Sequence, residues 1–216
     1  MTNIYQVISQ FKIVPVIAID EVSSAVPLAD ALIEGGLPIA EITFRTEVAA
    51  EVLRTLKRER PSLLVGAGTV LSVENLHLAK GCGAAFGLAP GLNPGVVEKA
   101  LRIGFPFAPG IATPSEIEQA LGLGIKVLKF FPAGDLGGSK MLNSLSGPYA
   151  HTGVKFIPTG GVTMDNLRDY LLVKTVAAVG GTWIAKREDI SAGNWNKIRD
   201  NCRKAVTLLQ QIQAGK

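Results

Sequence analysis

Short apolar segments rich in β-branched and aromatic residues alternate with segments whose apolar residues recur at helical spacing. The first pattern predicts strands buried on both faces, and the second predicts amphipathic helices packed over them. We expect strands at residues 13–19, 40–45, 63–70, 84–90, 105–111, 126–132, 154–161 and 177–184. We expect helices at residues 23–34, 48–58, 73–80, 94–102, 114–121, 164–172 and 195–212, and residues 134–147 carry a less regular helical pattern.

Several of the expected helices have clear start signals. Ser72, Asn93 and Thr113 are of the residue types that cap helix N-termini, and Pro94 and Pro114 follow two of them at the first helical position. Glycines follow many of the expected helix ends, where the backbone often turns left-handed. These signals support the boundaries taken from the apolar pattern.

The number of strand–helix units predicts the fold class. Eight units of about 27 residues each favour an α/β fold of the closed (β/α)8 TIM-barrel type. A doubly wound open sheet is the alternative, but the strand count and the polar residues at many strand ends favour the barrel. No linker or low-complexity tract interrupts the chain, so we expect a single domain over residues 1–216.

One charged residue, Lys129, lies within the apolar strand expected at 126–132. Burial favours the free amine of lysine over the ammonium form, and a free amine is what Schiff-base formation with a carbonyl substrate requires. The structural alternative is a lysine at the strand end whose amine reaches water.

The strand expected at 40–45 places three polar residues on one face. Glu41, Thr43 and Arg45 alternate with apolar residues, so their side chains point the same way. The functional interpretation is a general base, Glu41, beside an arginine that binds a carboxylate. A structural ion pair between the strand and a neighbouring loop is the alternative.

Other strand ends supply candidate pocket residues. Thr69 offers a hydroxyl after two glycines, and Pro90 either shapes the pocket floor or only forms a turn. Phe131 has the parity of Lys129 and should help to exclude water from its amine.

The last two expected strands end in glycine pairs. Gly160 and Gly161 end one strand, while Gly180 and Gly181 precede the hydroxyl-bearing Thr182 in the other. In TIM barrels these positions often form a phosphate site from backbone N–H groups. Tight turns without a ligand are the alternative.

Composition narrows the ligand class. The 216 residues carry a formal net charge of +4, and the basic run at residues 57–60 contains its own acid. An anionic small molecule therefore suits the chain better than a nucleic acid. Cys82 and Cys202 form no disulfide framework, which predicts a reducing cytoplasm.

We expect no membrane span and no metal site. Apolar runs are too short to cross a bilayer, and residues 1–12 lack the pattern of a signal peptide. His77 and His151 lie apart, and no spacing of His, Cys and carboxylates resembles a metal site.

Taken together, the motifs resemble the bacterial KDPG/KHG aldolases, the class I aldolases of the Entner–Doudoroff route. The resemblance spans nearly the whole chain, from VPV at 14–16 to GGTW at 180–183. The motifs that carry it are EITFRT at 41–46, GAGTV at 66–70, KFFPA at 129–133 and PTGGV at 158–162.

The resemblance implies a (β/α)8 barrel, usually a homotrimer, that needs neither metal nor cofactor. At the matching positions, Lys129 would form the Schiff base and Glu41 would shuttle protons. Arg45 and Thr69 would hold the pyruvyl carboxylate, while Pro90 and Phe131 would line the pocket. The glycine pairs would bind the phosphate of a keto-acid phosphate substrate.

Two positions depart from the family pattern: Thr182 replaces a serine, and the loop at 134–138 differs. The predicted reaction is cleavage of 2-keto-3-deoxy-6-phosphogluconate to pyruvate and glyceraldehyde 3-phosphate, with 4-hydroxy-2-oxoglutarate as a second substrate. Two other classes stay open: a phosphate-binding barrel isomerase or synthase that forms no imine, and a non-catalytic sugar-phosphate binder.

Overall fold

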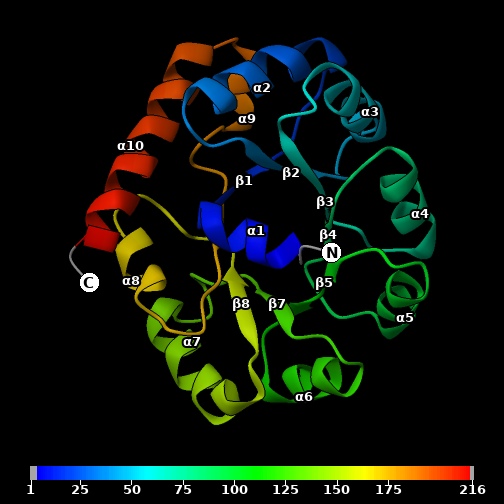
Figure 1. The fold of residues 1–216 in the computed structure, drawn as a ribbon, viewed down its shortest axis with the longest axis vertical. Helices are drawn as coiled ribbons and strands as arrows, with labels where there is room; N and C mark the ends of the chain where they lie inside the picture. The colour runs from blue at the N-terminus through cyan, green and yellow to red at the C-terminus, as the bar shows by residue number, and fades with distance from the viewer. Residues whose placement is uncertain (1–3, 215–216) are drawn as a thin grey trace.

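The computed structural model describes residues 4–214. Residues 1–3, on which part of the expectation about a signal peptide rests, lie outside the described residues. Helices surround the strands as a ring in chain order, from α2 through α6 to α10, and α1 is seen over the middle of the ring (Figure 1). The helices are α1 (Ile4–Phe11), α2 (Ala25–Glu34), α3 (Ala49–Glu59), α4 (Val73–Gly81), α5 (Pro94–Arg102), α6 (Pro114–Gly122), α7 (Gly138–Ser146), α8 (Leu167–Leu171), α9 (Arg187–Ser191) and α10 (Trp195–Ala214), with 3-10 turns η1 (Val22–Ser24) and η2 (Gly147–Thr152).

The strands pair in parallel throughout, which confirms the expected α/β class. One sheet has the order β5-β4-β3-β2-β1-β9 and the other has the order β6-β7-β8. Two isolated bridges, Phe156 to Val176 and Thr159 to Gly180, link β8 and the residue after it to β9 and the segment before it. The strands are β1 (Ile13–Ile17), β2 (Ile39–Thr43), β3 (Leu64–Gly68), β4 (Gly87–Leu88), β5 (Phe107–Ala108), β6 (Gly110–Ile111), β7 (Val127–Phe130), β8 (Lys155–Pro158) and β9 (Val179–Gly181).

The strand expected at 105–111 is interrupted at Pro109, which separates β5 from β6. Proline lacks the N–H that a ladder needs, so this interruption has a local cause. The Pro109 carbonyl nevertheless accepts a hydrogen bond of 2.8 Å from the backbone N–H of Lys129. The chain therefore stays hydrogen-bonded to β7 across this interruption, next to the candidate lysine.

Capping chemistry positions the helices as expected. The side chains of Ser72, Asn93 and Thr113 each accept a hydrogen bond from a backbone N–H, at the start of α4, α5 and α6 respectively. Thr113 and Glu116 form a reciprocal capping box. The sequence interpretation missed α1 and α9, and the less regular segment at 134–147 contains α7.

The core lies between the strands and the ring of helices. Strands β1 and β2 are buried along their whole length. β1 is the near-continuous apolar run expected of such a strand, whereas β2 also buries Glu41 and Thr43. Helix α3 turns Val52, Leu53 and Leu56 inward and keeps its charged residues outside. Within residues 4–214, no helix is long and apolar enough to cross a membrane.

Candidate functional site

The carboxyl ends of the strands surround a cavity of about 300 Å³. In a parallel sheet these ends meet at one edge, so residues far apart in sequence converge there. The cavity is lined by Val16, Glu41, Thr43, Arg45, Thr69, Pro90, Lys129, Phe131, Thr159, Gly160, Gly161, Val162, Gly181 and Thr182.

The structure brings together all of the predicted site residues except Gly180. Gly180 is not among the described residues that line the cavity. It is paired with Val14 in β1 and bridged to Thr159, whose side chain lines the cavity. A side chain on Gly180 would overlap the hydroxyl of Thr159, so the glycine is required for close packing.

Lys129 and Glu41 form a buried ion pair at the centre of the cavity wall. Lys129 Nζ lies 3.1 Å from Glu41 Oε1, and the two residues are 5% and 0% exposed. The alternative in which Lys129 extends its amine to water is therefore wrong. The ring centroid of Phe131 lies 5.6 Å from Nζ, so the aromatic ring shares in excluding water from the amine.

The second oxygen of Glu41 has a different environment. Glu41 Oε2 is buried and has no hydrogen-bond partner among residues 4–214. A buried carboxylate oxygen without a partner is costly, because it has lost its hydration. It can accept a proton or a hydrogen bond from a molecule that enters the cavity.

Arg45 lies at the exposed rim of the same cavity. The expected alternation is confirmed, since Glu41, Thr43 and Arg45 all line the cavity. Arg45 is not the partner of Glu41; its Nε donates a hydrogen bond of 3.2 Å to Thr43 Oγ1. The carboxylate instead pairs with Lys129, a pairing that the sequence interpretation did not anticipate.

Thr69 has an unusual backbone. Its φ of +56° places a β-branched residue in the left-handed region, which such residues rarely adopt. Strain of this kind persists only where surrounding structure enforces it, and it concentrates at ligand-binding sites. Thr69 directly follows Gly68 at the end of β3 and presents a half-buried side chain to the cavity.

The glycine pair after β8 has a backbone conformation that favours glycine. Gly160 and Gly161 have φ of +88° and +74°. A Cβ at Gly161 would lie 2.9 Å from Gly134 Cα, because the two loops pass close together. The backbone N–H of Gly134 donates to the Gly160 carbonyl at 2.8 Å, which fixes this approach.

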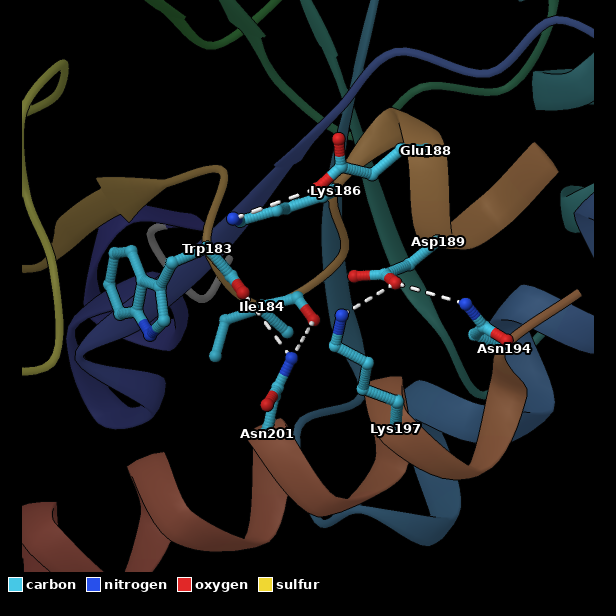
Figure 2. Close-up of polar contacts among 8 residues, drawn as sticks. All are labelled: Trp183, Ile184, Lys186, Glu188, Asp189, Asn194, Lys197 and Asn201. Atoms are coloured by element: carbon cyan, nitrogen blue, oxygen red, sulfur yellow. Dashed lines mark hydrogen bonds and ion pairs between the residues drawn. The ribbon is translucent and has the colours of Figure 1, made fainter. Parts of the chain in front are cut away.

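The segment after Thr182 is held by the last helix (Figure 2). Asn201 in α10 donates its side-chain amide to the carbonyls of Ile184 and Trp183, at 3.1 and 3.4 Å. The Trp183 ring occupies the space where a Gly181 side chain would be, 2.7 Å from a Cβ to Cη2. These contacts fix the backbone that carries Gly181 and Thr182 to the cavity.

A buried carboxylate in α9 joins that helix to α10. Asp189 Oδ1 accepts hydrogen bonds from Lys197 Nζ at 2.8 Å and from Asn194 Nδ2 at 3.1 Å (Figure 2). The hydrogen bond from Lys197 is the main cause that lowers the pKa of Asp189 below its ordinary value. This pair stabilises the connection between the cavity loop and the helical ring.

Four cavity residues were not predicted as site residues: Val16, Thr43, Thr159 and Val162. Thr43 had a detectable signal, because it shares the parity of Glu41 and Arg45. Thr159 directly precedes the glycine pair, but Val16 and Val162 are ordinary apolar residues with no distinguishing pattern. Within residues 4–214, no group of three or more His, Cys, Asp or Glu is arranged to hold a metal ion.

Comparison with known proteins identifies close relatives. The family model described as KDPG and KHG aldolase matches residues 4–201. A 2-dehydro-3-deoxy-phosphogluconate aldolase of Haemophilus influenzae is 44% identical over 208 residues, covering 96% of this chain and 97% of its own. A KHG/KDPG aldolase of Escherichia coli is 38% identical over 205 residues and covers 95% of both chains.

Among solved structures, a KDPG aldolase from Legionella pneumophila superposes with a TM-score of 0.90 at 39% identity. The match covers 94% of this chain and 98% of that one. That crystal structure contains pyruvate captured at low pH as a covalent carbinolamine intermediate.

Proposed function

The chain belongs to the KDPG and KHG aldolase family, and from that premise we propose that it is a class I aldolase that cleaves 2-keto-3-deoxy-6-phosphogluconate. The products of this lyase reaction are pyruvate and glyceraldehyde 3-phosphate. The observation that carries the proposal is the buried amine of Lys129, held 3.1 Å from Glu41 Oε1 on the cavity wall. A buried lysine amine beside a carboxylate is the arrangement that imine chemistry requires.

In the proposed mechanism, Lys129 attacks the C2 carbonyl of the substrate after giving a proton to Glu41. The resulting carbinolamine takes this proton back from Glu41 onto its hydroxyl and loses water to give a protonated imine. Glu41, once more ionised, removes the C4 hydroxyl proton directly or through water. The C3–C4 bond then breaks with the imine as electron sink, and the enamine is protonated and hydrolysed to release pyruvate.

Binding roles follow from the positions of the other side chains. Arg45 and Thr69 bind the pyruvyl carboxylate, since a guanidinium and a hydroxyl both donate to carboxylate oxygens. Pro90 and Phe131 contact the apolar part of the substrate. Backbone N–H groups near Gly160, Gly161 and Gly181 bind the phosphate together with the hydroxyl of Thr182. Gly180 leaves the space that the Thr159 side chain occupies in the cavity wall.

A second activity, cleavage of 4-hydroxy-2-oxoglutarate to pyruvate and glyoxylate, belongs to the same proposal. The pyruvyl half of this substrate is the same, so Lys129, Glu41 and Arg45 would act on it unchanged. The name of the E. coli relative as a KHG/KDPG aldolase supports this step.

We also propose a closed (β/α)8 barrel that forms one domain over residues 1–216. The bridge between Thr159 and Gly180 supports closure on one side of the sheet. On the other side, β5 and β6 are separated by Pro109 alone and belong to one expected strand.

The cellular setting is a proposal of the same kind. We place the enzyme in the Entner–Doudoroff route, in the cytoplasm, as a homotrimer, on the strength of family membership. The two cysteines are buried and unpaired, as suits a reducing compartment.

Borohydride reduction in the presence of pyruvate tests the proposal. The wild-type protein should gain one reduced pyruvyl adduct, located at Lys129 by peptide mass spectrometry. A Lys129→Met variant, which lacks the amine, is the control and should gain none. An isomerase or synthase without an imine, or a sugar-phosphate binder, would give no adduct in either protein.

A further inference from the structure

A buried hydroxyl connects Arg45 to the neighbouring strand. Thr43 Oγ1 lies 2.9 Å from the carbonyl oxygen of Ile17 in β1 and 3.2 Å from Arg45 Nε. Thr43 is 2% exposed and Ile17 is fully buried, so both belong to the rigid part of the wall.

The direction of these two hydrogen bonds follows from the chemistry of the groups. A carbonyl oxygen only accepts, so the single hydroxyl hydrogen of Thr43 is donated to Ile17. A guanidinium only donates, so the Thr43 oxygen must accept the hydrogen bond from Arg45 Nε. The Ile17 carbonyl therefore orients the hydroxyl as an acceptor for Arg45.

The arginine itself has little else to hold it. Arg45 is exposed, and within residues 4–214 its side chain makes no other hydrogen bond or ion pair. A long exposed side chain samples many rotamers, and ordering it costs conformational entropy on binding. Fixing Nε leaves the two terminal amino groups available to bind a carboxylate through parallel hydrogen bonds.

We propose that Thr43 is a positioning residue that pre-orients Arg45 for the carboxylate of the keto acid. This inference rests on the proposed function, in which Arg45 binds the pyruvyl end. The carboxylate is bound in the substrate and in the transition state alike, so losing the pre-orientation should raise KM and leave kcat nearly unchanged. Both substrates should be affected equally, because they share this carboxylate.

The test uses a pair of variants that differ at the hydroxyl. Thr43→Val removes the acceptor and keeps the branched shape, whereas Thr43→Ser keeps the hydroxyl and removes a methyl group. We expect Thr43→Val to raise KM about tenfold, as for loss of a hydrogen bond to a charged group. Thr43→Ser should recover most of that loss.

An Arg45→Ala background separates positioning from a general structural effect. If Thr43 acts through Arg45, Thr43→Val should add little to the loss of pyruvate affinity that Arg45→Ala causes. The pyruvate concentration that half-saturates borohydride trapping is the readout, since it remains measurable when turnover is slow. Should Thr43→Val fail to fold, as judged by circular dichroism, Thr43→Ala takes its place in the same cycle.

The outcomes distinguish this inference from the function on which it rests. A wild-type protein without a pyruvate adduct would overturn the proposed function itself. A wild-type adduct with equal KM for the Val and Ser variants would overturn the positioning role alone. A lower kcat at unchanged KM, or an undiminished effect in the Arg45→Ala background, would likewise show that Thr43 does not act by orienting Arg45.

Discussion

Gly68 lies directly against the carboxylate of Glu41. A Cβ at residue 68 would lie 2.7 Å from Glu41 Cγ and nearer still to Oε1. Glu41 lines the cavity, so a methyl group at residue 68 would push its carboxylate away from β3 and into that space. The glycine at the end of β3 therefore determines where the proposed proton acceptor sits.

Gly68→Ala should displace Glu41 and lower kcat by about 10²-fold, as for loss of a positioned acid–base group. Gly81→Ala is the matched control, because a Cβ at Gly81 has no neighbour within 4 Å and Gly81 lies in α4. Steady-state kinetics on both variants make the comparison. Comparable kcat values for the two would mean that Glu41 tolerates the displacement or is not the acid–base group.

Removing the lysine should affect stability as well as activity. Lys129→Met should abolish cleavage and pyruvate trapping, and it also leaves the buried Glu41 without its partner. Breaking a buried ion pair from one side typically costs about 3 kcal/mol. The Lys129→Met/Glu41→Gln double variant should recover much of this loss in urea unfolding, although it remains inactive.

If the double variant were no more stable than Lys129→Met, the ion pair would contribute little to folding. Retained cleavage in Lys129→Met would be a separate result, and it would rule out the imine mechanism.

Local pattern predicted much of the site, because parity along one strand depends only on neighbouring residues. Glu41, Thr43 and Arg45 were expected on one face, and all three line the cavity. The pairing of Glu41 with Lys129 was not predictable in this way, since the two residues are 88 positions apart and their strands are not hydrogen-bonded neighbours. It depends on how the whole sheet curls.

The remaining differences between the sequence-based predictions and the structure have physical causes that the sequence indicates only weakly. The left-handed backbone of Thr69 contradicts the preference of a β-branched residue, so tertiary contacts must impose it. Helix α9 has five residues and its N-cap, Lys186, makes no capping hydrogen bond, which left no recognisable start signal. Gly180 was expected at the cavity beside Gly181. The side chain of its bridge partner Thr159 occupies the space where a Gly180 side chain would be, so Thr159 lines the cavity in its place.

The carboxylate that joins α9 to α10 should make stability depend on pH. Lys197 lowers the folded-state pKa of Asp189, so the stabilisation is present above the ordinary carboxyl pKa of about 4 and is lost as pH falls through the lower folded-state pKa. Lys197 is 57% exposed, so solvent screening keeps this contribution to stability small. Asp189→Asn should therefore be less stable than wild type at pH 7, and the difference should shrink below about pH 4.

Chemical unfolding of both proteins across this pH range measures the difference in stability directly, because the other carboxyl groups titrate in both proteins and their contributions cancel. Lys197→Met removes the same hydrogen bond from the other side and should show the same convergence with wild type at low pH. A difference that stays constant with pH would mean that Asp189 contributes through packing and not through its charge.

The glycine pair after β8 allows the proposed phosphate site to be tested by substrate preference. Gly161→Val should crowd the proposed phosphate position, strain the left-handed backbone and press on Gly134. Gly153→Val is the matched control, because Gly153 has a similar φ of +78° but no neighbour within 4 Å of a Cβ. We expect kcat/KM for the phosphorylated six-carbon substrate to fall about 10²-fold in Gly161→Val, with a much smaller loss for 4-hydroxy-2-oxoglutarate, whose terminal carboxylate lies nearer the pyruvyl end. Gly153→Val should lose stability without changing the ratio of the two kcat/KM values. If Gly161→Val lost equally on both substrates, the phosphate would have to bind elsewhere.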